Sequence, residues 1–195
     1  MKKDYLLDIM RSKETVFTAN GIALLWGKTD VGFVRKKIYR YIKTGKLYPI
    51  RKGIYAKAEN YNRDELATKI YTPSYISFET ALGRAGVTFQ YYSQIFVASY
   101  LAREIKIEGQ TYSFKKIKDS ILTNQTGVEI KDNYCIASPE RAFLDVIYLR
   151  KDYYFDNLGG IDWQKVYEIL PIYGGNKRME KEIKQHQKET EQGLN

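Results

Sequence analysis

The sequence is poor in cysteine and histidine, and this shortage narrows the classes of protein it can be. Its 195 residues include one cysteine and one histidine. Because Cys135 has no second cysteine to pair with, nothing in the sequence indicates an oxidising compartment. His186 lies in a charged C-terminal segment with no cysteine and no second histidine, which argues against a metal site or a histidine-based catalytic triad.

Long apolar runs are missing as well. Residues 85–102 form the longest uncharged stretch, but polar residues such as Gln90 and Ser93 interrupt it, so it is too polar to span a membrane. At the N-terminus, Asp4 and Asp8 precede any apolar region of signal-peptide length. We therefore expect a soluble, cytoplasmic protein with no membrane partner.

Signatures of catalysis are also scarce. The sequence has no glycine-rich phosphate loop followed by Lys-Ser or Lys-Thr, and Cys135 lacks an activating base nearby, so we predict it to be a buried small apolar residue. The best enzyme pattern is Asp119 followed by Glu129 and Lys131, an arrangement that could bind Mg²⁺ in a nuclease. The same acid-x-Lys spacing recurs at Glu104, which shows how easily a lysine-rich chain produces it. We expect a protein that is not an enzyme and uses no cofactor and no metal, with a nuclease as the less favoured alternative.

Acidic residues are scarce in the first third of the chain only. Residues 1–60 hold 14 lysines and arginines against 5 acidic residues, whereas residues 61–195 hold 18 of each. Between positions 28 and 57 there are ten basic residues and one acid, Asp30. Such a concentration of positive charge is the electrostatic footprint of a polyanionic partner.

The hydrophobic pattern predicts a winged helix-turn-helix over residues 1–72. It favours helices over residues 2–13, between Thr18 and Gly27, and over residues 31–44, where Gly45 ends the third helix. The following residues 47–57 alternate strand-forming side chains around a turn at Arg51, Lys52 and Gly53, which indicates a two-stranded wing. Three short-linked helices followed by such a hairpin are typical of DNA-binding modules.

The third helix is predicted to be the recognition helix. Its apolar side holds Val31, Val34, Ile38, Tyr41 and Ile42, and its outer side holds Gly32, Phe33, Lys36, Arg40 and Lys43. We expect Lys36 and Arg40 to face the major groove of double-stranded DNA, Phe33 to contact a thymine methyl, and Lys52 to contact a phosphate. The complete predicted DNA-binding set is Thr29, Phe33, Lys36, Lys37, Arg40, Lys43, Arg51 and Lys52.

The rest of the chain predicts a mixed α+β domain over residues 73–175, with hairpins and a helical C-terminus. We expect a helix capped by Ser77, then strands over residues 94–98, 104–107, 111–117, 128–131 and 134–137. Ser138 and Pro139 should open a strong helix that runs through Leu149, with Glu140 serving its start and Arg141 forming an i,i+4 pair with Asp145. A further helix follows over residues 162–170. Residues 176–195 are charged and predict a solvated helix or a frayed tail.

Three motifs resemble the AbiEi-type antitoxin family of type IV toxin-antitoxin systems, also described as transcriptional regulators. The first is a basic-Gly-x-Tyr turn at Lys52, Gly53 and Tyr55. The second is a serine-led helix with Ser77, Glu79, Ala81, Leu82 and Gly86, and the third is a later helix with Ala137, Pro139, Glu140, Arg141, Ala142, Leu144 and Asp145. Family members have a small residue and then histidine before the glycine of the second motif, where this chain has Arg84 and Ala85.

The resemblance implies a transcriptional repressor of its own operon. The sequence leaves two arrangements on the operator open, a homodimer and cooperating monomers. The resemblance also implies counteraction of a nucleotidyltransferase-like toxin without a stable complex between the two proteins. The toxin's own Gly-Ser signature with paired aspartates is absent from this chain. Two alternatives remain open from the residues alone: a DNA-binding regulator without an antitoxin role, and a protein-interaction module whose basic face binds an acidic partner.

Overall fold

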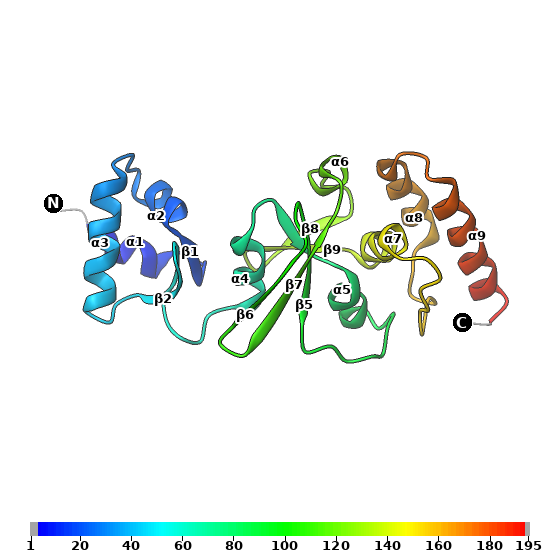
Figure 1. The fold of residues 1–195 in the computed structure, drawn as a ribbon, viewed down its shortest axis with the longest axis horizontal. Helices are drawn as coiled ribbons and strands as arrows, with labels where there is room; N and C mark the ends of the chain where they lie inside the picture. Colours follow the sequence, from blue (N-terminus) through cyan, green and yellow to red (C-terminus); the bar gives the residue numbers. More distant parts are fainter. Residues whose placement is uncertain (1–3, 194–195) are drawn as a thin grey trace. The chain divides into compact units, whose positions relative to one another are not determined.

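The computed structural model describes residues 4–193 and has a mixed α+β fold with two compact units, Met1–Ile70 and Tyr71–Asn195 (Figure 1). Residues 4–193 form nine α-helices, one 3-10 helix and two β-sheets. The first two residues of the helix predicted over residues 2–13, and the last two of the predicted tail, lie outside the described part of the chain. None of the described helices is long and apolar enough to cross a membrane.

The first unit combines four helices with a small sheet. The helices are α1 (Tyr5–Arg11), α2 (Ala19–Trp26), α3 (Val31–Lys43) and α4 (Arg63–Ile70), and the strands are β1 (Val16–Thr18), β2 (Tyr48–Arg51) and β3 (Ile54–Ala56). The sheet order is β1-β3-β2, with every pair antiparallel. The first three helices and the β2–β3 hairpin lie where the sequence predicts them. The strand β1 was not predicted, because it pairs with β3, far along the chain, and no turn signal in the sequence links the two.

One apolar core holds the helices and strands of this unit together. Phe17 from β1, Ile22 and Trp26 from α2, and Val34 and Ile38 from α3 are all buried in it. The predicted apolar side of the third helix is wrong at its first residue, since Val31 is 54% exposed. Val31 lies in the first turn of α3, one turn before the buried position 34, and the core does not extend that far.

The second unit is built on a six-stranded sheet. Its strands are β4 (Ser74–Ile76), β5 (Ile95–Ser99), β6 (Arg103–Ile107), β7 (Gln110–Lys116), β8 (Val128–Lys131) and β9 (Tyr134–Ala137), in the order β6-β7-β5-β4-β9-β8. The pairs β4–β9 and β5–β7 are parallel and the others are antiparallel. Both predicted hairpins are confirmed, and residues with positive φ, Gly109 in one turn and Asp132 and Asn133 in the other, close them.

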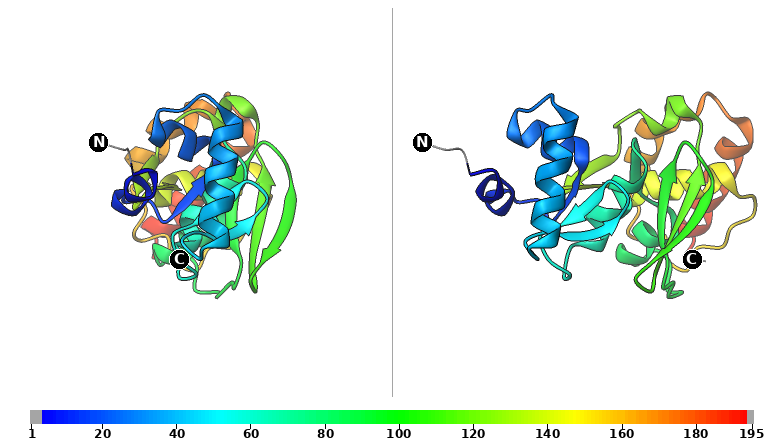
Figure 2. Two further views of the ribbon diagram at one scale, coloured as in Figure 1. Left: turned by 90° about the vertical axis from the view of Figure 1, so that its left-hand side faces the viewer. Right: turned by 60° about the vertical axis from the view of Figure 1, so that its left-hand side comes forward.

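Helices cover this sheet from one side (Figures 1 and 2). They are α5 (Phe78–Arg84), α6 (Asp119–Leu122), α7 (Pro139–Leu149), α8 (Trp163–Ile169), the 3-10 helix η1 (Leu170–Tyr173) and α9 (Lys177–Glu191). Strand residues Phe96 and Ala98 share one core with the buried side chains of α5 and α7. The predicted cap of α7 is confirmed, because the Ser138 hydroxyl accepts from the Arg141 amide at 3.3 Å.

The charged C-terminal segment forms an ordered helix in this core. Asn176 caps α9, and its side chain accepts from two amides of the first turn. Met179 and Ile183, four residues apart on one face of α9, are completely buried. Of the two predicted alternatives, a helix and a frayed tail, the structure has the helix, because two well-spaced apolar residues suffice to anchor it.

Candidate nucleic-acid interface

Local signals in the sequence fix both ends of α3. Asp30 is the N-cap, and its carboxylate accepts from the Phe33 amide at 3.0 Å. Gly45 follows the helix with a φ of +66°, a conformation that glycine adopts at little cost. Asp30 is the only acidic residue between positions 28 and 57, and the cap holds its charge at the positive end of the helix. The helix α3 itself therefore contains basic residues and no acidic residue, so no carboxylate within the helix neutralises its positive charge.

The exposed face of α3 is basic. Lys36, Arg40 and Lys43, three of the predicted contact residues, are exposed along the helix. At about 100° per residue they share one side of the helix, opposite the buried Val34 and Ile38. The structure therefore brings these three predicted residues together on one open surface.

Two further residues of this face were missed by the sequence analysis. Arg35 is exposed, and Tyr39, which is 58% exposed, borders this face next to Lys43. The Lys43 ammonium lies 4.9 Å from the centre of the Tyr39 ring, within the range of a cation–π contact. Tyrosine occurs both in cores and on surfaces, so the residue type alone does not show that Tyr39 is exposed. Its exposure becomes clear only from the position of the core.

Phe33 and Lys37 lie at the border of the exposed face. Phe33 was predicted on the outer side, but its side chain is half-buried, and its ring packs against Tyr5 at 5.4 Å between centroids and against the apolar core. The Lys37 ammonium lies 5.7 Å from the centre of the Tyr5 ring and 5.8 Å from that of Phe33. Both side chains are half-buried, so each presents only part of its surface beside the basic face.

The hairpin turn adds a second basic element. Arg51 and Lys52 are both exposed, and Gly53 has a φ of +82° that lets the chain turn between β2 and β3. The Ala19 amide donates to the Gly53 carbonyl at 2.9 Å, which ties this turn to the start of α2. Thr29 is exposed in the short connection before α3.

The recognition-helix candidate and the hairpin belong to the same rigid core. Leu47, just before β2, and Tyr55 of β3 pack with Val34 and Ile38 of α3, and the views of Figure 2 show α3 beside the hairpin. The basic residues of both elements are thus presented from a shared scaffold. Such a scaffold can hold a helix in a groove of duplex DNA while a neighbouring turn contacts phosphates.

In the second unit, the two helices that carry the family-like motifs meet in a buried polar network. Asp145 of α7 accepts from the hydroxyls of Tyr75 at 3.0 Å, Ser77 at 2.7 Å and Tyr173 at 2.7 Å. The predicted i,i+4 pair is confirmed at 3.4 Å between Arg141 Nε and Asp145 Oδ1, but both side chains are completely buried. Burial raises the pKa of Asp145, and the Arg141 charge opposes this rise.

The side-chain cap predicted for Ser77 is wrong. Ser77 does precede α5, yet its hydroxyl makes no cap hydrogen bond because it donates to Asp145 instead. Two members of the network, Tyr75 and Tyr173, were not singled out from the sequence, since nothing local links positions 75, 145 and 173. The Arg141 guanidinium also donates to the Ile121 and Thr126 carbonyls, both at 2.7 Å. This network joins a strand, three helical segments and a loop, and its geometry is that of a structural centre.

The remaining candidates do not assemble into a site. Glu129, Lys131 and Asp119, the nuclease pattern, are exposed, and within residues 4–193 no group of three or more metal-ligating side chains lies together. Cys135 is only half-buried, and burial raises the pKa of its thiol. His186 packs between aromatic rings of the second unit, and burial lowers its pKa.

Comparison with known proteins adds no relative. No family model matches the sequence, and no curated protein matches it.

Proposed function

We propose that the protein is a sequence-specific DNA-binding transcriptional repressor whose first unit works as a winged helix-turn-helix. One observation carries the proposal: the exposed face of α3 and the adjoining hairpin turn are basic, and the only acid between positions 28 and 57 is used as a helix cap. Lys36 and Arg40 would reach base edges in the major groove, and Arg51 and Lys52 would contact phosphates.

Selection of duplexes from a random library tests this proposal. We expect the wild-type protein to enrich one motif, and Arg40→Ala to relax the preference at one base pair with a loss of about 1–3 kcal/mol, as for the loss of one base-edge contact. Lys52→Ala should weaken binding to all sequences alike and reduce the salt slope by roughly 0.9, the value for one phosphate contact. A library without an enriched motif would refute sequence-specific recognition.

We also propose that the protein is the antitoxin of a type IV toxin-antitoxin system and that the second unit provides this activity. The support is the resemblance of its two motifs to the AbiEi-type family, together with the contact between Ser77 and Asp145 that joins them. The second unit also lacks the excess positive charge of the first, with 16 basic and 16 acidic residues in Tyr71–Asn195. It therefore has no general electrostatic attraction to DNA that would make repression its main role.

Genetic separation of the two activities tests the antitoxin proposal. Lys36→Glu with Arg40→Glu changes exposed residues only, so the fold should survive while repression of the native promoter is lost. The same variant should still rescue growth when the adjacent toxin gene is expressed, whereas a chain without residues 73–195 should not. Loss of rescue in the folded charge-reversal variant would show that counteraction depends on DNA binding, and the independent role of the second unit would be withdrawn.

A further inference from the structure

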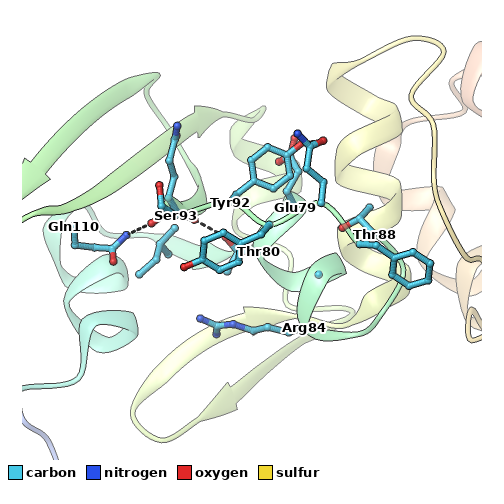
Figure 3. Close-up of a pocket in the computed structure, with 13 residues that line it drawn as sticks. Glu79, Thr80, Arg84, Thr88, Tyr92, Ser93 and Gln110 are labelled. Carbon is cyan, nitrogen blue, oxygen red and sulfur yellow. Dashed lines mark hydrogen bonds between the residues drawn. The ribbon is translucent and has the colours of Figure 1, made fainter.

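The second unit contains a preformed pocket that neither proposed activity uses. It has a volume of about 400 Å³ and lies between α5 and the loop of residues 87–94, with Gln110 of β7 at its border (Figure 3). The loop is fixed at both ends, since the Phe89 amide donates to Asp156 at 2.7 Å and Gln110 Nε2 donates to the Ser93 carbonyl at 2.6 Å. Pockets that bind small molecules are commonly preformed and have volumes of this order.

Two buried polar atoms at this pocket have no hydrogen-bond partner among residues 4–193: Oε2 of Glu79 and the hydroxyl of Thr88. Glu79 is 3% exposed and Thr88 is 4% exposed. The other carboxylate oxygen of Glu79, Oε1, pairs with Arg150 at 2.5 Å, so one oxygen is engaged and the other is not. Leaving such groups unsatisfied costs stability, and a ligand that pairs with them would recover this cost.

Glu79 and Thr88 border the same face of α5 and line the same pocket. Glu79 and Gly83 are four residues apart and therefore neighbours on the helix surface. A Cβ built on Gly83 would lie 3.8 Å from Thr88 Oγ1, which places the Thr88 hydroxyl beside this face. The absence of a side chain at position 83 keeps the space in front of α5 open, and both polar residues line it (Figure 3).

Three aromatic residues of the loop also line this pocket. Phe89 is 70% exposed, Tyr91 is 88% exposed, and Tyr92 is half-buried with its ring packed edge-on against Phe96. All three line the pocket within four consecutive positions. Exposed rings held on an anchored loop provide flat surfaces on which a planar heterocycle can stack.

We propose that this pocket binds a nucleotide whose base presents adjacent N–H donors and a carbonyl acceptor, as guanine does. The free oxygen of the Glu79 carboxylate can only accept, so it selects N–H groups, while the Thr88 hydroxyl can donate to the base carbonyl. The aromatic loop would stack on the base, and Arg84, which is exposed and lines the pocket, carries charge of the sign that a phosphate requires. This inference is independent of the DNA-binding and antitoxin proposals.

Titration of the full-length protein with guanosine monophosphate, followed by calorimetry, tests the inference. We expect saturable binding at one site per chain, about tenfold tighter than for adenosine monophosphate, whose base offers an acceptor where guanine has its ring N–H. Absence of saturable binding, or equal affinity for the two nucleotides, would overturn the proposal. A crystal structure grown with guanosine monophosphate that showed only water between Glu79 and Thr88 would overturn it too.

Variants at the pocket connect binding to these residues. Glu79→Gln should reduce the affinity about tenfold or more, but it also alters the contact with Arg150, so its fold must be verified by thermal unfolding. Gly83→Leu provides a second variant, because position 83 is exposed and a Cβ there meets no close atom. Its side chain should fill the pocket and abolish binding, whereas the matched Gly83→Ala protein should still bind. Unchanged affinity in Gly83→Leu would exclude this pocket as the binding site.

Discussion

Removal of the Asp145 carboxylate tests whether the buried network of the second unit is a structural centre. In Asp145→Ala, the fully buried Arg141 would lose its counter-charge, and the hydroxyls of Tyr75, Ser77 and Tyr173 would lose their shared acceptor. Breaking one partner of a buried ion pair costs about 3–5 kcal/mol, and each buried hydroxyl left without an acceptor adds about 1 kcal/mol. We expect a loss of about 5 kcal/mol or more in the free energy of unfolding.

This loss is comparable with the whole stability of a domain at the lower end of the usual 5–15 kcal/mol. Urea unfolding followed by far-UV circular dichroism should therefore show the second unit largely unfolded without denaturant in Asp145→Ala. Because the circular dichroism signal also reports the first unit, a separate probe is the fluorescence of Trp163, which packs against the core of the second unit, measured in a Trp26→Phe background so that the tryptophan of the first unit does not contribute.

The double variant Arg141→Met with Asp145→Leu distinguishes an ion pair from two independent residues. It removes both charges together, so no uncompensated charge remains buried, and we expect it to be more stable than Asp145→Ala by at least about 2 kcal/mol. Additive losses in the double variant, or a loss below about 1 kcal/mol in Asp145→Ala, would refute the structural role. The two residues would then have to be re-examined as part of a functional site.

Three further predictions follow from single positions. Gly127→Ala should lower the free energy of unfolding by about 1–3 kcal/mol in urea titrations. Gly127 has a φ of +73°, and a Cβ at this position would lie 2.8 Å from Ile169 Cδ1 and 2.9 Å from Arg141 Cβ. An unchanged midpoint of unfolding would contradict this packing. Burial lowers the pKa of His186 in the folded state, so the unfolded state binds the proton more readily. The free energy of unfolding should therefore fall as the pH decreases below the unfolded pKa of about 6.5. His186→Phe should lose this part of the pH dependence, and an identical pH dependence in both proteins would refute the assignment. Tyr39→Ala should weaken duplex-DNA binding in fluorescence anisotropy without changing its salt slope, because the ring carries no charge, and unchanged affinity would remove Tyr39 from the interface.

The helices and strands that could be predicted from the sequence are those marked by cap or turn residues close to their ends. Ser138 and Pro139 mark the start of α7, and Asp132 with Asn133 marks a hairpin turn, because cap and turn chemistry involve neighbouring residues only. The strands β1 and β4 have three residues each and depend on partners far along the chain, such as Ala56 for Val16. Neither strand follows a turn signal, whereas β3, which also has three residues, follows the turn at Arg51, Lys52 and Gly53 and was therefore predictable.

At the candidate functional surfaces, too, the sequence could not predict features that depend on contacts between residues far apart in the chain. The basic face of α3 was predictable, because periodicity and charge agree over its 13 residues. The half-burial of Phe33 depends on Tyr5 of α1, and the hydrogen bond of Ser77 depends on a carboxylate 68 positions away. No sequence motif marks the pocket beside α5. Its two polar atoms stand out only because they have no hydrogen-bond partner among the described residues of the folded protein.

The salt dependence of duplex-DNA affinity tests most directly whether α3 and its hairpin form a DNA-binding surface. Fluorescence anisotropy at several salt concentrations should compare the wild-type protein with Lys36→Glu/Arg40→Glu and with the control Lys106→Glu/Lys131→Glu, which has the same change in net charge on exposed residues of the second unit. We expect the α3 variant to lose at least about 30-fold in affinity and the control to remain within about threefold of the wild type. Equal losses in both variants, or no loss in either, would contradict the assignment of DNA binding to this surface.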